Sequence, residues 1–212
     1  MLLASGNEHK YREFVDFFKS IELCANAPVE LLCARDFPES PGNAEETGST
    51  YEENSLIKAR AWANCTGIPA IADDSGLEVR RLGWRPGVFS ARAASGSDSD
   101  RVVWMLNELS GEADRRARFV ACVVIAFPGG GFSSRDYFAA LGACWGNISS
   151  SPRGESGFGY DPLFVPDGYD ATFAELGPAA KSKISHRAKA MRGVAQMLSS
   201  VLKYHAVHLG LS

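Results

Sequence analysis

Ala70-Ile71-Ala72-Asp73-Asp74-Ser75-Gly76 is the stretch of the chain that constrains its fold most strongly. It is a short apolar run that follows a proline and ends in two carboxylates, which predicts a buried strand with charged groups at its C-terminal end. In α/β proteins such strand ends place functional side chains at the edge of the sheet. We therefore expect an α/β fold organised around this strand.

The two carboxylates are adjacent, and this limits what they can do together. Consecutive residues of a strand point to opposite faces of the sheet, so Asp73 and Asp74 face each other only if the backbone turns between them. The sequence predicts either one carboxylate on each face or two around a metal ion at a bent strand end. Magnesium, which binds one or two carboxylates together with substrate phosphates, suits the second arrangement. A turn whose side chains bond only the local backbone is the alternative.

Length and composition indicate an ordinary globular protein. The 212 residues, 45% of them hydrophobic, predict one domain of one or two lobes. A net charge of −3 argues against duplex nucleic acid as a partner. Five scattered cysteines without a Cys-x-x-Cys pair predict reduced thiols and a cytoplasmic location. We expect neither secretion nor membrane insertion, because the chain shows no basic leader and no apolar run of roughly 18 residues.

The N-terminal segment has the pattern of a strand, a small-residue turn and a helix. Residues 1–4 are apolar, the turn is Ser5-Gly6-Asn7, and apolar residues then recur at helical spacing. The N–H groups of such a turn and the helix dipole attract an anion, and Lys10 adds a cation in the first helical turn. Structural capping by serine and asparagine is the alternative interpretation.

An acidic loop that contains Glu46 leads into the second predicted helix. Residues 50–53 have the form of a capping box, and the helix is expected to run to about Asn64. Asn54 and Lys58 are four residues apart and share one face of it. If that face is turned towards the acidic loop, Lys58 can reach a phosphate that a metal ion on Glu46 also contacts. A solvated surface lysine is the alternative.

The other elements follow from residue patterns. We expect a strand at 29–33, a returning antiparallel strand at 77–82, a functional loop at 83–92, a helix capped within 97–99 that ends near 109, a hairpin of 117–127 and 133–144, an apolar strand at 163–165, and a last long helix capped by Ser185.

Two segments of the C-terminal half suggest recognition of a planar, negatively charged ligand. Phe158-Gly159-Tyr160-Asp161 forms a platform that can stack on a ring and bond its edge, although aromatic packing at a sheet edge is the commoner use. Residues 181–187 gather two lysines, a histidine and an arginine around the expected start of the last helix. Basic groups are unfavourable at that end of a helix, which indicates an anionic partner. A purely structural histidine is the alternative.

The motifs of the chain, taken in order, carry a resemblance to a known family. They are Ser5-Gly6-Asn7-Glu8-His9-Lys10, Glu45-Glu46-Thr47-Gly48 with Asn54 and Lys58-Ala59-Arg60, Ala72-Asp73-Asp74-Ser75-Gly76, Pro86-Gly87 with Ser90-Ala91-Arg92, Phe158-Gly159-Tyr160-Asp161-Pro162 and Ser185-His186-Arg187. On these motifs the chain resembles the inosine triphosphate pyrophosphatases. The resemblance implies a long mixed central β-sheet flanked by helices, two lobes with a nucleotide cleft between them, and usually a homodimer. It also implies magnesium-dependent hydrolysis of ITP, dITP and XTP to the monophosphate and pyrophosphate, which cleanses the nucleotide pool.

The resemblance further implies roles for individual residues. Asp74 is the implied general base and metal ligand, and Glu46 is the second metal ligand, with Asp73 or Glu45 nearby. A phosphate contact is implied for Lys58, and the triphosphate is lined by Ser5, Gly6, Asn7, Glu8, His9 and Lys10. The nucleoside is held by Ser75, Phe158, Gly159, Tyr160, Asp161, Lys181, His186 and Arg187.

Other functions fit parts of the same pattern. A related α/β pyrophosphatase that acts on modified pyrimidine or methylated nucleotides shares the chemistry. A nucleotide-binding sensor without catalysis would use the same turn and the same basic residues, but Glu46 and Asp74 would repel a triphosphate unless a metal ion lay between them. Binding of single-stranded RNA is suggested only by the aromatic and basic residues.

Overall fold

The computed structural model describes residues 1–21, 30–37, 40–42, 45–130 and 136–208. Its helices and strands, in chain order, are β1 (Leu2–Leu3), α1 (Glu8–Ser20), β2 (Leu32–Cys33), α2 (Tyr51–Thr66), β3 (Ala70–Val79), α3 (Asp98–Glu108), β4 (Arg116–Ala126), β5 (Tyr137–Ile148), β6 (Phe164–Pro166), α4 (Phe173–Ile184) and α5 (His186–His208). Short 3₁₀ segments lie between them, at η1 (Ala34–Asp36), η2 (Arg80–Leu82), η3 (Gly87–Arg92) and η4 (Pro128–Gly130).

The strands form one six-stranded sheet in the order β2-β1-β3-β4-β5-β6. The strand β1 pairs in parallel with β2 and with β3, whereas β5 and β6 pair antiparallel. The sheet is therefore mixed and flanked by helices, and the predicted α/β fold class is confirmed. The expected hairpin strands are the neighbours β4 and β5, and their predicted connection begins with η4 at Pro128–Gly130, whereas residues 131–135 and Val29 lie outside the described residues.

The chain divides into two compact units. The first comprises Met1–Asp74, Cys122–Leu141 and Ala190–Ser212, and the second comprises Ser75–Ala121 and Gly142–Lys189. The division falls inside β3, between Asp74 and Ser75. A single domain with a cleft between two lobes stays a prediction.

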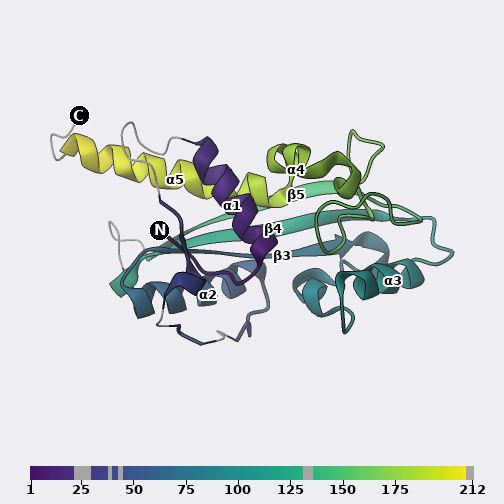
Figure 1. Ribbon diagram of the computed structural model, residues 1–212, viewed down its shortest axis with the longest axis horizontal. Helices are drawn as coiled ribbons and strands as arrows, with labels where there is room; N and C mark the ends of the chain where they lie inside the picture. Colours follow the sequence, from purple (N-terminus) through teal and green to yellow (C-terminus); the bar gives the residue numbers. More distant parts are fainter. Residues whose placement is uncertain (22–29, 38–39, 43–44, 131–135, 209–212) are drawn as a thin grey trace. The chain divides into compact units, whose positions relative to one another are not determined.

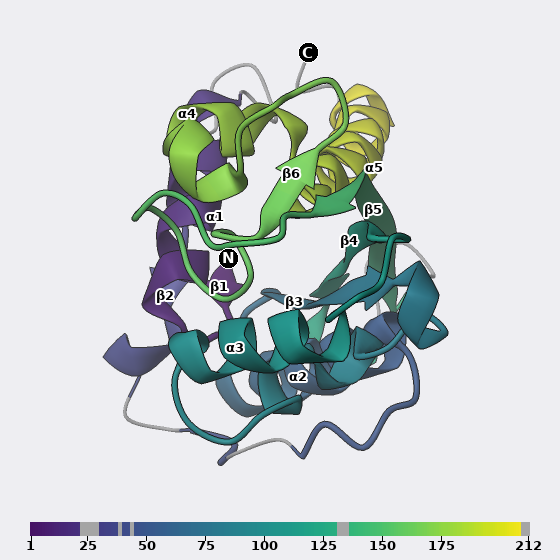
Figure 2. The ribbon, with the colours of Figure 1, turned by 90° about the vertical axis from the view of Figure 1, so that its right-hand side faces the viewer.

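In the first unit, helices cover both faces of the sheet. Figures 1 and 2 show α2 on one face, with α1 and α5 on the other. Ser55 anchors α2 to the sheet, because its hydroxyl donates to the carbonyl of Cys122 at 2.8 Å. On the opposite face Gly193 of α5 packs closely, since a Cβ there would lie only 2.6 Å from the Cβ of Ala140.

The second unit has its own hydrophobic core. Side chains from β3, β4 and β5 pack with residues of α3 and α4, among them Leu77, Val102, Met105, Phe119, Ile148 and Phe173. Phe119 is an aromatic centre of this core, with ring centroids 4.7 Å from Phe164 and 6.2 Å from Phe173. Aromatic pairs at these separations add stability beyond the area that they bury.

The prediction of a separate antiparallel strand at residues 77–82 is wrong. The strand β3 continues from Ala70 to Val79 and is followed by η2. The Ser75-Gly76 pair, which has the composition of a turn, serves close packing instead. A Cβ on Gly76 would lie 2.0 Å from the carbonyl oxygen of Gly87 and 2.7 Å from the hydroxyl of Ser90. A glycine inside a strand often marks such a close approach of another backbone segment.

The capping signals in the sequence are confirmed by the helix ends. Thr50 and Glu53 form the capping box of α2, Ser97 caps α3, and the Ser185 hydroxyl accepts from the amide of Ala188 in α5. Helix α4 was not predicted, although its capping box at Thr172 and Glu175 is a helix-start signal that the sequence contains. Gly177 and Pro178 interrupt the helical pattern there and conceal the element.

The position of α4 changes the interpretation of two basic residues. Lys181 and Lys183 lie in the last turn of α4, before the cap at Ser185. Cations are favourable at a helix C-terminus. Helix α4 therefore gives the two lysines a favourable position of their own, and their presence there does not by itself require an anion.

The described cysteines are free thiols, at positions 33, 65, 122 and 144, and Cys24 lies outside the described residues. Burial raises the pKa of the Cys122 thiol to about 12 and that of Cys144 to about 11. Because the thiolate is the reactive form, both are structural core residues at neutral pH. Within the described part of the chain, every helix is too short or too polar to cross a membrane.

Replacing Gly76 with alanine tests the close approach. We expect Gly76→Ala to lower the free energy of unfolding by on the order of 2 kcal/mol, because the new methyl group meets a backbone carbonyl that cannot move without shifting η3. Urea denaturation measures the loss. Gly6→Ala is the matched control, since a Cβ at Gly6 meets no atom within 4 Å. Equal stabilities of the two variants would contradict the packing argument.

Candidate active site

Asp73 and Asp74 contact different helices on opposite faces of the sheet. Asp73 Oδ1 lies 3.2 Å from Nζ of Lys10, in α1. Asp74 Oδ2 accepts a hydrogen bond from Nδ2 of Asn54, in α2, at 3.1 Å. Since α1 and α2 cover opposite faces (Figure 2), the strand sends one carboxylate to each face, which is the first of the two predicted arrangements.

Lys58 connects the acidic loop to the middle of β3. Its ammonium group donates to Glu46 Oε1 at 2.7 Å and to the backbone carbonyl of Asp73 at 2.8 Å. The interpretation of Lys58 as a solvated surface residue is wrong, because its side chain is only 17% exposed. We call the residues that meet here the carboxylate–lysine cluster, and they are Lys10, Glu46, Asn54, Lys58, Asp73 and Asp74.

Asn54 fixes the orientation of Asp74. The side chain of Asn54 is fully buried, and its Oδ1 accepts from the amide of Gly48 at 2.9 Å. Its Nδ2 is therefore left to donate to Asp74. Burial raises the pKa of Asp74, and the nearby Lys58 ammonium partly offsets this rise. A carboxylate with a raised pKa takes up a proton more readily, as a general base must.

In the structure, the predicted phosphate-binding turn caps the start of helix α1. Asn7 is the N-cap of α1, with its Oδ1 accepting from the amide of Lys10 at 3.1 Å, and the Ser5 hydroxyl accepts from the amide of Asn7 at 3.2 Å. The carboxylate of Glu8 lies 2.9 Å from Arg35. Gly6 and His9 are exposed. Within residues 5–10, Lys10 is the member whose described contacts join the carboxylate–lysine cluster.

A second group of predicted residues meets in the second unit. Lys181 Nζ lies 2.6 Å from Asp161 Oδ2 and 4.4 Å from the centroid of the Phe158 ring. Arg187 Nη2 donates to the Ser75 hydroxyl at 2.8 Å, and its guanidinium carbon lies 5.8 Å from the same ring. We call Ser75, Phe158, Asp161, Lys181 and Arg187 the aromatic–cation cluster.

Both cations of this cluster are buried. Arg187 is 1% exposed and Lys181 is 6% exposed. Lysine and arginine are almost never fully buried unless they are paired, because taking a charge out of water costs several kcal/mol. The cluster is thus a defined arrangement within the fold and differs from a solvated basic surface.

The side chains of Asp161 and Tyr160 hold the loop that carries Phe158 in place. Asp161 Oδ2 accepts from the amide of Phe158 at 2.9 Å as well as from Lys181. Tyr160 is buried, its hydroxyl donates to the carbonyl of Ser90 at 3.1 Å, and burial raises its pKa to about 12. Phe158, which is half-buried, is therefore the ring of this segment that lies beside the two cations.

His186 packs in the core of the second unit. Its ring stacks on Phe119 with centroids 4.7 Å apart and an angle of 12° between the planes. The residue is 3% exposed. The sequence left two interpretations of His186 open, a structural residue and a residue that binds the edge of a base. Its packing favours the structural one.

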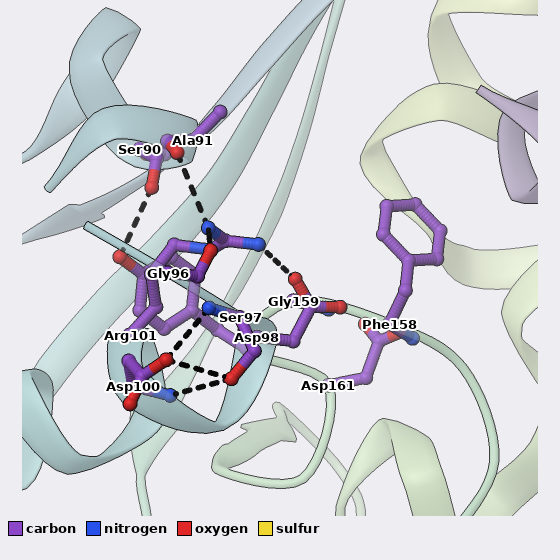
Figure 3. Close-up of polar contacts among 11 residues, drawn as sticks. Ser90, Ala91, Gly96, Ser97, Asp98, Asp100, Arg101, Phe158, Gly159 and Asp161 are labelled. Carbon is purple, nitrogen blue, oxygen red and sulfur yellow. Dashed lines mark hydrogen bonds and ion pairs between the residues drawn. The ribbon is translucent and has the colours of Figure 1, made fainter. Parts of the chain in front are cut away.

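Asp98 was not singled out in the sequence, where it was one of three possible helix caps. Its carboxylate contacts the backbone of the Phe158 loop, since Oδ2 accepts from the amide of Gly159 at 2.5 Å (Figure 3). The two residues are 61 positions apart, and no local pattern connects them.

Among the described residues, no group of three or more histidine, cysteine, aspartate or glutamate side chains is arranged to hold a metal ion. A closed cage made only of protein ligands is thus not present in that part of the chain. The carboxylates of Asp74 and Glu46 both act electrostatically with Lys58, and Glu46 also raises the pKa of Asp74.

Comparison with known proteins agrees with this fold. A dITP/XTP pyrophosphatase of Deinococcus deserti is 49% identical over 194 residues, which cover 90% of this chain and 85% of that protein. A dITP/XTP pyrophosphatase of Deinococcus radiodurans is 50% identical over 148 residues, or 69% of this chain and 72% of that protein. The solved structure of the Staphylococcus aureus Ham1 protein matches with a TM-score of 0.78 and 35% identity, covering 94% of this chain and 97% of that one.

These findings give the class and then the family. The protein is a hydrolase that acts on acid anhydrides, as predicted. The chain belongs to the Ham1 family, whose model matches residues 1–197. The resemblance to the inosine triphosphate pyrophosphatases is thereby confirmed as a family relationship.

The buried ion pair of the aromatic–cation cluster can be tested by its effect on stability. We expect Asp161→Asn to lower the free energy of unfolding by on the order of 3 kcal/mol, because it leaves the ammonium of Lys181 buried beside a neutral amide. Urea denaturation measures the change.

Two further variants complete this test. Adding Lys181→Met to Asp161→Asn should recover much of the lost stability, since the buried charge is then gone. Asp114→Asn breaks the exposed ion pair with Arg80 and should change stability far less. A double variant as unstable as the single one would contradict the assignment.

Proposed function

We propose that this protein is a magnesium-dependent nucleoside triphosphate pyrophosphatase that hydrolyses ITP, dITP and XTP to the monophosphate and pyrophosphate. The observation that carries the proposal is the environment of Asp74, a buried carboxylate with a raised pKa that is held by Asn54 and lies near the ammonium of Lys58. Membership of the Ham1 family and relatives named dITP/XTP pyrophosphatase support the reaction and the substrate class.

We assign the two clusters to different parts of the nucleotide. In this proposal the carboxylate–lysine cluster and the turn at residues 5–10 bind the triphosphate, and the aromatic–cation cluster binds the base. Asp74 and Ser75, one from each group, are consecutive residues of β3. Lys10 and Lys58 exchange part of their present ion pairing for phosphate oxygens when a nucleotide binds.

The donor set at Asp74 and Glu46 fits magnesium. Magnesium is usually bound by one or two carboxylates together with water and substrate phosphates, and it does not need a cage of protein ligands. Asp74 and Glu46 would hold the ion, with Asp73 or Glu45 as a further nearby carboxylate. When bound, the ion supplies positive charge that stabilises the phosphate oxygens in the transition state.

The chemical step uses Asp74 as general base. A water oxygen attacks the α-phosphorus as the carboxylate of Asp74 takes its proton, and the bond from the α-phosphorus to the bridging oxygen breaks. The electron pair of that bond leaves with pyrophosphate. Lys10 and Lys58 neutralise the charge that develops there, and because they are already positioned they need little reorganisation.

Selection of the base rests on its 6-position. Hypoxanthine and xanthine carry a carbonyl acceptor there, and donors of Arg187 bind it while Phe158 stacks on the ring. Adenine carries an amino group, so these buried donors would lose their acceptor. A site built on hydrogen bonds rejects such a ligand strongly for that reason.

Two further properties belong to the proposal, a homodimer, which the family resemblance implies, and a cytoplasmic location, which the cysteine pattern predicts. We expect the protein to be a homodimer and to act in the cytoplasm. Sedimentation or light scattering at micromolar concentration gives the oligomeric state directly.

Pyrophosphate release from a substrate panel tests the proposed function. We expect rapid release from ITP, dITP and XTP, slow release from ATP and GTP, and loss of all release when EDTA removes the metal. Hydrolysis confined to modified pyrimidine or methylated nucleotides would favour the related pyrophosphatase. Tight ITP binding without release would contradict the enzymatic proposal and favour a sensor.

Asp74→Asn and Asp73→Asn form a matched pair in the same assay. Asp74→Asn keeps the shape of the side chain and an oxygen for Asn54, but it removes the base, so we expect kcat to fall by about 100-fold or more. Asp73→Asn should cost less, since Asp73 is paired with Lys10 and is not the proposed base. Retention of most activity by Asp74→Asn in the presence of magnesium would show that the base is another group.

A further inference from the structure

Both oxygens of the Asp98 carboxylate have a partner, one within the first turn of α3 and one outside the helix. Oδ1 pairs with the guanidinium of Arg101, and Oδ2 accepts from the amide of Gly159 at 2.5 Å (Figure 3). Arg101 is well shielded from solvent, with 17% of its side chain exposed. The contact with Gly159 joins the start of α3 to the loop that carries Phe158.

Capping of α3 does not explain the position of Asp98. The cap is made by Ser97 and Asp100, because Ser97 N and Oγ both donate to Asp100 Oδ2, at 2.7 and 2.8 Å, and the amide of Asp100 donates back to Ser97. An acidic residue in the first turn is favourable to the helix dipole wherever it points. The direction of Asp98 towards Gly159 is therefore a separate feature.

The loop is fixed through two consecutive amides. Asp161 accepts from the amide of Phe158 at 2.9 Å, and Asp98 accepts from the next amide, that of Gly159. The first contact is local and closes the turn. The second fixes the turn to a different element, and Gly159 meets it in the left-handed region, with a φ of +61°.

Arg101 and Tyr160 also donate hydrogen bonds to backbone carbonyls of the segment 87–97. Arg101 Nη1 donates to the carbonyls of Gly96 at 3.2 Å and Ala91 at 3.4 Å. The hydroxyl of Tyr160 donates to the carbonyl of Ser90. The Asp98–Arg101 pair and Tyr160 thus hold both the loop after β5 and the segment after β3 in place.

We propose that Asp98 is a positioning residue for base recognition, which sets the Phe158 ring against Lys181 and Arg187 by fixing the amide of Gly159. This inference rests on the proposed function, in which Phe158 stacks on the purine. Asp98 touches neither the base nor the phosphates in this assignment. Its effect passes through the backbone of one residue to the ring beside it.

The proposal separates base binding from phosphate binding. Without the contact to Asp98, the Phe158 ring samples more positions, and ordering it costs free energy each time a purine binds. The KM for ITP should rise by about tenfold, which is the scale of one hydrogen bond to a charged group, while kcat changes little. Inhibition by inorganic tripolyphosphate, which has no base, should stay the same.

Three variants in the full chain test this. Asp98→Ala removes both contacts, and Asp98→Asn keeps an acceptor for the amide of Gly159 but loses the charge facing Arg101. Asp100→Ala is the matched control, because it damages the cap of the same helix turn without touching Gly159. Steady-state kinetics with ITP, inhibition by tripolyphosphate, calorimetric binding of IMP and the melting temperature are measured for each.

We expect the KM for ITP to rise most in Asp98→Ala, less in Asp98→Asn and hardly at all in Asp100→Ala, with tripolyphosphate inhibition equal in all three. An equal KM in Asp98→Ala and Asp100→Ala, or a parallel loss of tripolyphosphate binding, would overturn the proposal. If Asp98→Ala does not fold, Asp98→Asn is compared with Asp100→Asn, and an equal KM again overturns it.

The failure of the proposed function would look different. In that case the wild-type protein releases no pyrophosphate from ITP, and the comparison rests on IMP binding alone. Weaker IMP binding by Asp98→Ala than by Asp100→Ala still supports the positioning role. Equal IMP binding, or none by the wild type, overturns it.

Discussion

The structure depends on one geometric constraint, the two-residue repeat of a strand that carries two consecutive carboxylates. Because β3 sends Asp73 to the face covered by α1 and Asp74 to the face covered by α2, the two groups have different partners, Lys10 and Asn54. Asp74 combines burial with a raised pKa and a fixed amide donor, Nδ2 of Asn54. The division between an ion-paired carboxylate and a basic one thus follows from strand geometry.

The continuation of the same strand serves the second unit. After Asp74, Ser75 accepts a hydrogen bond from the buried Arg187, and Gly76 lets the backbone at Gly87 approach closely. Buried cations require partners that are placed accurately, and here the partners are Ser75 for Arg187 and Asp161 for Lys181. Asp98 is a further accurately placed partner, but the group that it binds is a backbone amide. That amide belongs to the loop that carries the Phe158 ring.

Features that depend on neighbouring residues could be predicted from the sequence. Contacts between residues that lie far apart in the sequence could not. Helix caps at Thr50, Ser97 and Ser185 and the divergence of Asp73 and Asp74 depend on neighbours within four positions, and all could be predicted. The Ser75-Gly76 pair misled the prediction of β3, since a glycine needed for close packing has the same composition as a glycine in a turn. The contact of Asp98 with Gly159 spans 61 residues, so no pattern could reveal it.

Hydrolysis of ITP in water enriched in oxygen-18 shows whether water attacks the α-phosphorus, as the proposed role of Asp74 requires. Mass spectrometry of both products locates the new oxygen. We expect one labelled oxygen in the inosine monophosphate and none in the pyrophosphate. Label in the pyrophosphate would mean attack at the β-phosphorus, and it would contradict both the proposed reaction geometry and the role of Asp74.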